Sequence, residues 1–287
     1  MIHGGQLVAL PTETVYGLGA DAKNPAAVAG IFESKRRPHF DPLIVHVSDL
    51  EHAKKQAEGF PDIARQLADR FWPGPLTLVV RKRKDIPDLV TAGMPTVGLR
   101  VPDHSLIQEV IRLSECCIAA PSANPFGEIS PTTAEHVVAG LEGRIEAVLD
   151  GGPCEVGLES TIVSCAGDEP VVLRVGGLSI EEIEEVAGPI ARATPDSTKD
   201  DAAQPAPGML SRHYAPKTLL KLIDADDTAV AEEGHCGLLT WGESPETGQF
   251  ERIERLGSEE NLRSCAAGFF AALRDLDAAN LDVIIAH

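Results

Sequence analysis

The stretch that decides the fold is QLVALPTETVYGLG at residues 6–19, a short apolar run followed by a polar loop with two glycines. Residues 6–10 of this stretch predict a buried strand, and we expect a loop from Pro11 through Gly19. The hydroxyls of Thr12 and Thr14, followed by glycines, are typical of a loop whose backbone approaches a ligand closely. A threonine-rich turn with glycines is, taken alone, usually only a turn. The loop is therefore a candidate site that needs support from elsewhere in the chain.

Strands and helices are mixed through the following 170 or so residues, without a regular βαβ repeat. A helix is predicted to open at Asn24-Pro25, with proline in its first turn, and to reach about Ser34. Further helices are predicted at residues 61–71, 104–114, 132–141 and 179–187. Strands are predicted at residues 42–47, 76–81, 96–101, 117–120, 147–149, 160–164 and 171–175. The fold class is therefore α/β with a twisted, mixed sheet.

The composition changes between Ala187 and Pro207, where proline, alanine and polar residues replace any hydrophobic period. This is typical of a linker. Beyond it, strands at 219–223, 237–240 and 283–285 surround a helix with apolar positions at Leu262, Ala266, Phe269, Phe270 and Leu273. We expect residues 1–187 to form the first domain, 188–216 a linker or lid, and 217–287 a second, smaller α/β domain.

Both ends of the chain are short for this arrangement. Only five residues precede Gln6, and the last strand-like run is not followed by a closing helix. We therefore expect the chain to be truncated and the small domain to be incomplete.

The bulk composition excludes several classes of function. The formal net charge is −19, from 25 basic and 44 acidic residues, so tight direct binding of nucleic acid through a broad basic face is disfavoured. No apolar run approaches the roughly 20 residues that span a bilayer, and the start lacks the pattern of a secretory signal. We expect a cytoplasmic protein with no membrane partner.

The six cysteines predict no metal site. Cys116, Cys117, Cys154, Cys165, Cys236 and Cys265 form no C-x-x-C pair and have no histidine at zinc-like spacing. We expect reduced, structural thiols and no protein-held metal.

Three further stretches carry polar or basic residues beside predicted strands. Together with the loop at 11–19, we call these stretches islands. They are KRRPHFDPLIVH at 35–46, APSANPFGEISP at 120–131, and GLESTIV at 157–163. We group the last with the nearby segment LRVGG at 173–177. Basic residues at a helix C-terminus also complement the helix dipole, so a structural reading of the first island stays open. The sequence has no Walker loop, no G-x-S-x-G and no G-x-G-x-x-G after a strand. Any nucleotide chemistry must therefore use basic side chains and hydroxyls.

These islands, with WPGPLT at 72–77 and TVGLRVP at 96–102, resemble the YrdC-type threonylcarbamoyl-AMP synthase family in the same order over about residues 5–187. The segment PGMLSRHYAP at 207–216 and the small domain resemble the longer, two-domain branch. The resemblance implies a nucleotidyltransferase that converts L-threonine, bicarbonate and ATP into threonylcarbamoyl-AMP and pyrophosphate. The product would serve the N6-threonylcarbamoyladenosine modification of tRNA through a downstream threonylcarbamoyl transferase. Mg²⁺ is expected to be held mainly by the ATP phosphates.

The resemblance also implies roles for single residues. Threonine is implied to be held by Thr14, His46, Arg100, Ala120 (through its backbone) and Ser160. ATP is implied to be held by Lys35, Arg37, Asp41, Thr96, Ser122, Asn124, Ser130, Arg174, His213 and Tyr214. Catalytic roles are implied for Lys35, Arg37, Ser122 and Asn124. Asp41 stands where the family commonly has asparagine. Arg212, His213 and Tyr214 are expected to form a lid that excludes water from the adenylate.

Two other readings remain open. The first is a carbamoyl-transfer protein of the hydrogenase-maturation type, which shares this domain, but the modules that normally accompany it are absent. The second is a non-catalytic double-stranded RNA-binding module, for which a chain of net charge −19 is a poor candidate. RNA binding that depends on salt, without ATP consumption, would favour the second.

Overall fold

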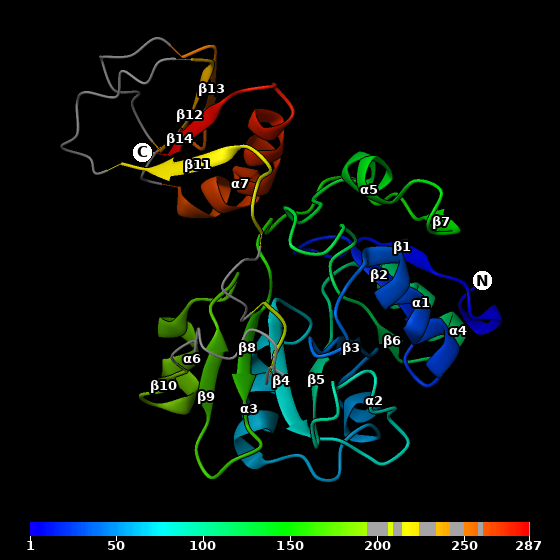
Figure 1. The fold of residues 1–287 in the computed structure, drawn as a ribbon. Coiled ribbons are helices and arrows are strands. Elements are labelled where there is room, and N and C mark those ends of the chain that lie inside the picture. Colours follow the sequence, from blue (N-terminus) through cyan, green and yellow to red (C-terminus); the bar gives the residue numbers. More distant parts are fainter. Residues whose placement is uncertain (194–205, 209–213, 224–233, 242–249, 258–260, 287) are drawn as a thin grey trace.

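The computed structural model describes residues 1–193, 206–208, 214–223, 234–241, 250–257 and 261–286. Within these ranges the chain forms one large mixed sheet with surrounding helices and a second, smaller parallel sheet (Figure 1). The predicted α/β class, with a mixed sheet and a smaller α/β unit, is confirmed. Among the described residues, no helix combines the length and apolar character needed to cross a bilayer.

The large sheet runs in the order β10-β9-β8-β4-β5-β3-β6-β2-β1-β7 over the described residues. Its strands are β1 (Val8–Leu10), β2 (Gly17–Asp21), β3 (Ile44–His46), β4 (Leu76–Arg81), β5 (Thr96–Arg100), β6 (Ile118–Ala119), β7 (Ala147–Val148), β8 (Thr161–Ser164), β9 (Val171–Arg174) and β10 (Ala191–Arg192). Parallel pairs such as β3 with β5 and antiparallel pairs such as β4 with β5 occur side by side. Because β10 lies beyond residue 187, this sheet extends past the expected domain boundary, and the division into domains stays a prediction.

Helices flank the large sheet. They are the single-turn η1 (Ile2–Gly4), α1 (Pro25–Lys35), α2 (Leu50–Lys54), α3 (Asp62–Phe71), α4 (Ser105–Ser114), α5 (Ala134–Leu141) and α6 (Ile180–Ala187). The predicted opening of α1 is confirmed, since the Asn24 side chain accepts hydrogen bonds from the backbone of Ala26 and Ala27. Helix α1 ends at Lys35, and the next residue, Arg36, takes a left-handed conformation that terminates the helix.

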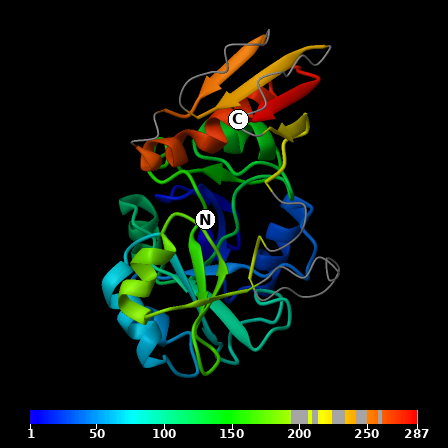
Figure 2. The ribbon, with the colours of Figure 1, turned by 90° about the vertical axis from the view of Figure 1, so that its left-hand side faces the viewer.

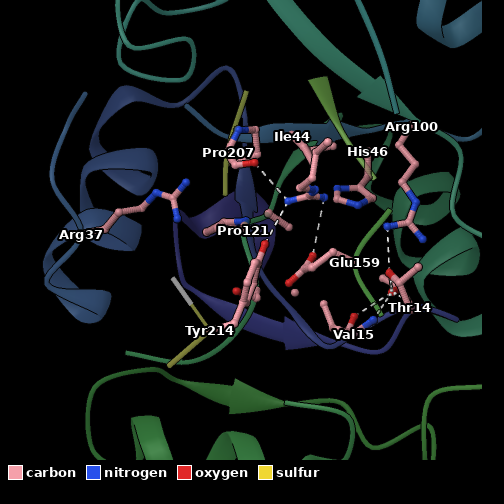
Figure 3. A pocket seen from close by; sticks show the side chains of 15 residues that line it. Thr14, Val15, Arg37, Ile44, His46, Arg100, Pro121, Glu159, Pro207 and Tyr214 are labelled. Atoms are coloured by element: carbon pink, nitrogen blue, oxygen red, sulfur yellow. Dashed lines mark hydrogen bonds and ion pairs between the residues drawn. The ribbon is translucent and has the colours of Figure 1, made fainter. Parts of the chain in front are cut away.

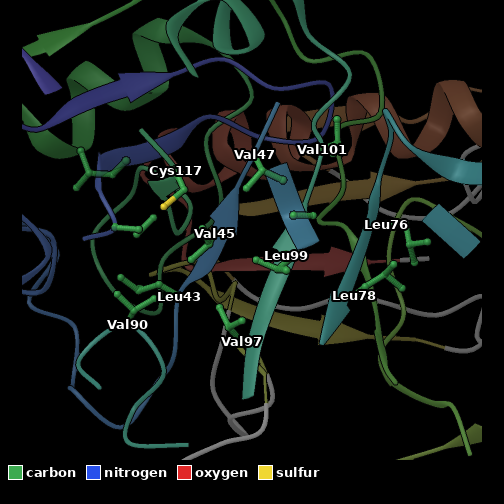
Figure 4. Packing of buried hydrophobic residues seen from close by; sticks show 14 of the residues in the cluster. Leu43, Val45, Val47, Leu76, Leu78, Val90, Val97, Leu99, Val101 and Cys117 are labelled. Atoms are coloured by element: carbon green, nitrogen blue, oxygen red, sulfur yellow. The ribbon is translucent and has the colours of Figure 1, made fainter. Parts of the chain in front are cut away.

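The core lies around the central strands β3, β4 and β5. In β4 every residue from Leu76 to Val80 is buried, because both faces of the sheet are covered. Valine and leucine side chains from all three strands pack together, as Figure 4 shows for Val45, Leu78 and Leu99. This rigid centre fixes the ends of the strands from which the site residues project.

The small sheet has the order β11-β14-β12-β13 and is parallel throughout its described strands. These are β11 (Leu219–Leu222), β12 (Cys236–Thr240), β13 (Arg252–Arg255) and β14 (Val283–Ala286). Helix α7 (Leu262–Asp277) packs Phe270, Leu273 and Leu276 against one face of this sheet. In Figures 1 and 2, α7 lies between the small sheet and the rest of the molecule.

The prediction of a loop through Gly19 is wrong for residues 17–19, which belong to β2 and pair antiparallel with β1. Glycine is unfavourable in the interior of a strand and common in turns, so Gly17 and Gly19 led to the prediction of a loop where the structure has a strand. A Cβ atom on Gly19 would lie 2.9 Å from Leu10 Cδ1, so the glycine allows close packing within the sheet. Sequence reasoning also missed α2, β10 and β13.

Candidate active site

A cavity lies where the loop after β1 meets the ends of β3 and β5 and the start of β8. Figure 3 shows Arg37 and Arg100 entering from opposite sides of the view, with Glu159 between them. The lining residues are Thr12, Thr14, Val15, Gly17, Arg37, Ile44, His46, Arg100, Ala120, Pro121, Ser122, Glu159, Arg174, Pro207 and Tyr214. Residues of all four islands, of the segment 96–102 and of the end of the predicted linker therefore meet at one place.

Arg100, the last residue of β5, is held by buried partners. Its guanidinium donates to Thr14 Oγ1 at 2.9 Å, to Glu13 Oε1 at 2.6 Å and to the Gly74 carbonyl at 3.2 Å. The side chains of Arg100 and Glu13 are 4% and 5% exposed, so the charge of the arginine is balanced inside the protein. Sequence reasoning did not assign Glu13, although it stands between the two threonines of the first island.

His46 lies beside Arg100, because β3 and β5 pair in parallel with these two residues in register. Burial lowers the pKa of His46 to about 3, and the charge of Arg100 adds to the effect. Its Nδ1 atom has no hydrogen-bond partner among the described residues. His46 is therefore a neutral imidazole that lines the cavity, and its Nδ1 is a buried atom.

Arg174, at the end of β9, is fixed by carbonyl and hydroxyl groups. It donates to the Ser160 carbonyl at 2.9 Å and to Ser160 Oγ at 3.1 Å. It also donates to the Pro207 carbonyl and the Tyr214 hydroxyl, both at 3.2 Å. Ser160 thus supports Arg174 from behind the cavity wall.

Glu159 lines the cavity and was not predicted, although it belongs to the island GLEST. Its Oε1 accepts a hydrogen bond from Ser130 Oγ at 2.7 Å, and its Oε2 lies 3.8 Å from Arg174 Nη2. The signal that could have identified it is an acidic residue directly before the serine of a buried strand. Glu159 gives the cavity a negative group among its arginines.

Arg37 is paired with Asp41, which is fully buried. Arg37 Nη2 lies 2.9 Å from Asp41 Oδ2, but outside hydrogen-bond geometry, and it donates instead to the Pro42 carbonyl at 2.8 Å. Burial raises the pKa of Asp41, and the charge of Arg37 opposes this. Asp41 does not line the cavity, so it acts on Arg37 from the protein side.

Lys35 points to the protein backbone in this structure. It is 1% exposed, and its ammonium donates to the carbonyls of Ser122, at 2.6 Å, and Asn124. Burial lowers its pKa, and Arg37 adds to the effect. Asn124 in turn donates to the Glu128 carbonyl at 2.8 Å, while its Oδ1 has no partner among the described residues. Lys35 therefore shapes the loop that carries Ser122.

The structure places the sequence-predicted residues in three groups. Those that line the cavity are Thr14, Arg37, His46, Arg100, Ala120, Ser122, Arg174 and Tyr214. Those buried directly behind it are Lys35, Asp41, Asn124, Ser130 and Ser160. Thr96 lines a neighbouring cavity, which shares Ile44 and Pro207 with the first. His213, together with Arg212, lies outside the described residues.

Among the described residues, Cys116, Cys117, Cys154 and Cys165 are free thiols. Burial raises the pKa of Cys117, Cys154 and Cys165 to about 12. Within the described part of the chain, no group of three or more histidine, cysteine, aspartate or glutamate residues could hold a metal ion. Protonated, buried thiols fit the structural role that the sequence predicted.

The fold and the cavity together define an α/β protein that collects three arginines and several hydroxyl groups around one cavity. The family model described as "Telomere recombination", for Sua5, YciO and YrdC proteins, matches residues 1–176. The model described as "Threonylcarbamoyl-AMP synthase, C-terminal domain" matches residues 178–287. The chain belongs to this family, in its two-domain branch of threonylcarbamoyl-AMP synthases.

Two relatives at high identity support this assignment. The chain is 43% identical to a Bacillus subtilis threonylcarbamoyl-AMP synthase over 297 aligned residues, which cover 100% of this chain and 85% of the relative. It is 41% identical to Pyrococcus abyssi Sua5, whose crystal structure was determined in complex with L-threonine. That structure matches with a TM-score of 0.91 over 99% of this chain and 86% of the other. The family name of these relatives is that of an enzyme.

One further match is limited to the fold. The crystal structure of HypF in a phosphate- and nucleotide-bound form is 19% identical, with a TM-score of 0.52, and the match covers 61% of this chain and 28% of that one. This likeness carries no argument about activity.

Proposed function

We propose that the chain is a nucleotidyltransferase that makes threonylcarbamoyl-AMP and pyrophosphate from L-threonine, bicarbonate and ATP. The observation that carries the proposal is the convergence of Arg37, Arg100 and Arg174, from three separate segments, on one cavity with threonine and serine hydroxyls. The names of the full-length relatives and the threonine complex of the Pyrococcus protein support it. The product would pass to a threonylcarbamoyl transferase for tRNA modification in the cytoplasm.

The proposed reaction needs charge stabilisation more than a protein nucleophile. The amino group of threonine adds to bicarbonate and water is lost, which gives a carbamate. A carbamate oxygen then attacks the α-phosphorus of ATP, and the bond to the departing pyrophosphate breaks. Because the carbamate and the triphosphate are both anionic, fixed guanidinium groups would stabilise the charge in the second step.

We place threonine at the Arg100 end of the cavity. Arg100 is suited to a carboxylate because its fork can make two parallel hydrogen bonds. Thr14 Oγ1 and the neutral ring of His46 lie beside it and offer groups for the substrate hydroxyl and amine. Ala120 would contribute backbone groups, and Ser160, which also contacts Arg174 of the other end, would complete the threonine site.

We place ATP at the end formed by Arg37, Ser122, Arg174 and Tyr214. The neighbouring cavity around Thr96 would take a further part of the nucleotide, because the two cavities share Pro207 and Ile44. In this proposal Lys35 and Asn124 position the Ser122 loop, since both bond backbone carbonyls there. Ser130 would act through Glu159, and His213 keeps its implied place at the nucleotide.

The residues present fit a magnesium ion that arrives with ATP. Of the cavity-lining residues, Glu159 carries the acidic side chain, and it is already bonded to Ser130. Mg²⁺ keeps several waters and needs few protein ligands, so phosphate oxygens would supply most of its shell. Bound there, the ion would reduce the negative charge of the phosphates during attack.

Pyrophosphate release from ATP tests the proposal directly. We expect release only when threonine, bicarbonate and Mg²⁺ are all present, and loss when each is left out in turn. Release without threonine would contradict the proposal and favour another carbamoyl chemistry. Salt-dependent binding of double-stranded RNA with no ATP consumption would favour the RNA-binding alternative.

A further inference from the structure

Helix α7 of the small domain packs directly against loops that form the cavity wall. Its Phe270 and Leu273 share a buried cluster with Val15 and Ile129, which come from the other side of the boundary between the two sheets. Phe270 also packs against Tyr214, with ring centroids 5.7 Å apart. Since Val15 and Tyr214 line the cavity, α7 is the layer immediately behind it.

One side chain on this face of α7 makes polar contacts across the boundary. Arg274 donates from Nε to the Ser130 carbonyl at 3.1 Å and from Nη2 to the Ile129 carbonyl. Burial lowers the pKa of Arg274, but a guanidinium keeps its charge in proteins. A charged group with two carbonyl partners holds the backbone of this loop more strongly than neutral hydrogen bonds would.

The loop held by Arg274 leads into the cavity. Ser130 is fully buried, and its hydroxyl donates to Glu159 Oε1 at 2.7 Å. The other oxygen of Glu159 lies 3.8 Å from Arg174 Nη2. A continuous series of contacts therefore runs from Arg274 through Ser130 and Glu159 to Arg174, and its last two members line the cavity.

We propose that Arg274 is a positioning residue for the nucleotide end of the active site. Arg274 fixes the backbone of Ser130, and the hydroxyl of Ser130 orients Glu159. Glu159 in turn helps to hold the guanidinium of Arg174 in position. The small domain is thereby part of the structure of the active site. This inference rests on the proposed function, because it takes Arg174 to face ATP.

The inference predicts that the two substrates respond differently. The threonine end is held by other contacts, since Arg100 bonds Glu13, Thr14 and Gly74. Replacing Arg274 should therefore impair ATP use and leave threonine use nearly unchanged. A general loss of structure would impair both.

The test compares Arg274→Met, Arg274→Lys and the control Arg263→Met, which removes the same charge from the exposed start of α7. Pyrophosphate release is measured against ATP and threonine concentration, and melting temperature is recorded for each protein. For Arg274→Met we expect the KM for ATP to rise about tenfold or more, because small misplacements at a reacting centre have large effects on rate. The KM for threonine should change less than about threefold, because the groups at the threonine end are not displaced. Arg274→Lys, which can reach one carbonyl at a time, should give an intermediate ATP value, and Arg263→Met should match the unaltered protein.

The outcomes separate this inference from the proposed function. If the unaltered protein releases no pyrophosphate, the proposed function fails. If it does, and Arg274→Met matches Arg263→Met, the inference is overturned. Equal rises in both KM values, with a lower melting temperature, would also overturn it. Should Arg274→Met fail to fold, the difference between the two KM values of Arg274→Lys decides the question.

Discussion

At the residue scale, the site depends on charges that are balanced inside the protein. Arg100 and Glu13 form an ion pair that is almost fully buried. The backbone N–H of Asp103 donates a hydrogen bond to the second carboxylate oxygen of Glu13 at 3.0 Å. Because both oxygens of Glu13 are satisfied, Arg100 is held in one orientation and keeps its position before a ligand arrives.

Removing Glu13 should leave a buried, unpaired guanidinium. We expect Glu13→Ala to lower the free energy of unfolding by about 3–5 kcal/mol, the usual cost of breaking a buried pair. The control is Glu51→Ala, because Glu51 is 77% exposed in its pair with Lys54. Loss of such a surface pair costs roughly 0–1 kcal/mol. Urea denaturation of both variants measures the difference, and similar losses would contradict the prediction.

His46 should make stability depend on pH. The unfolded chain binds a proton at this histidine near pH 6.5, whereas the folded chain does so only near pH 3. Between these values the unfolded state holds more protons, so the folded state loses stability as the pH falls, by up to about 1.4 kcal/mol per pH unit. His46→Gln should flatten this decline in urea denaturation at pH 5–7.

Nuclear magnetic resonance offers an independent check on His46. Its ring signals should not titrate between pH 5 and 8. The ring signals of exposed His235 should titrate and serve as the internal control. The pKa of His235 is raised by its hydrogen bond with Glu251. A His46 midpoint near 6.5 would contradict the burial argument.

At the scale of elements, Pro207 and Tyr214 line the end of the cavity at which we propose the nucleotide to bind. Both residues bond Arg174, and Pro207 lies between the two neighbouring cavities. Burial raises the pKa of Tyr214, so its hydroxyl stays protonated. The lid expected from Arg212, His213 and Tyr214 stays a prediction, because Tyr214 is the member of this group that lies among the described residues.

Tyr214→Ala should reduce product formation more than ATP affinity. A hydrogen bond to a charged group is worth about 1.5 kcal/mol or more, which corresponds to roughly tenfold in rate. Tyr214→Phe keeps the ring against Phe270 and loses only the hydroxyl, so it should retain part of the activity. Calorimetric titration with ATP and turnover assays measure the two effects separately. Unchanged turnover in Tyr214→Ala would rule out the lid.

At the scale of the whole molecule, the two sheets are joined by close backbone contact. Gly157, with φ of +69°, approaches helix α7 so closely that a Cβ atom would lie 2.5 Å from the Cα and carbonyl oxygen of Ala267. Two residues later, Glu159 enters the cavity. The position of α7 and the position of Glu159 are therefore linked.

Gly157→Ala should force α7 away from the loop. The matched control is Gly143→Ala, since Gly143 has φ of +73° but nothing within 4 Å of a new Cβ. Both variants carry similar backbone strain, of about 1–3 kcal/mol, and only Gly157→Ala adds the clash. We expect a lower melting temperature and lower pyrophosphate release for Gly157→Ala than for the control. Equal behaviour would show that α7 moves without cost.

Much of the fold could be predicted because its signals are local. The apolar run at 76–81 coincides with β4, and the helical period at 61–71 coincides with α3 within one residue. The strand at 17–21 could not be predicted, because its glycines serve close packing that depends on residues far along the chain. The two-residue strand at 191–192 is too short to show any period.

The sequence by itself determined which islands carry polar chemistry, their order, and the family to which the chain belongs. It did so because turn residues, hydrophobic period and motifs are properties of neighbouring positions. Only the tertiary structure decided that Glu13 pairs with Arg100 across 87 positions, that Lys35 faces carbonyls, and that Arg274 reaches Ile129 across 145 positions. Such contacts depend on how whole elements pack, and a partner's identity is not encoded near the residue that binds it.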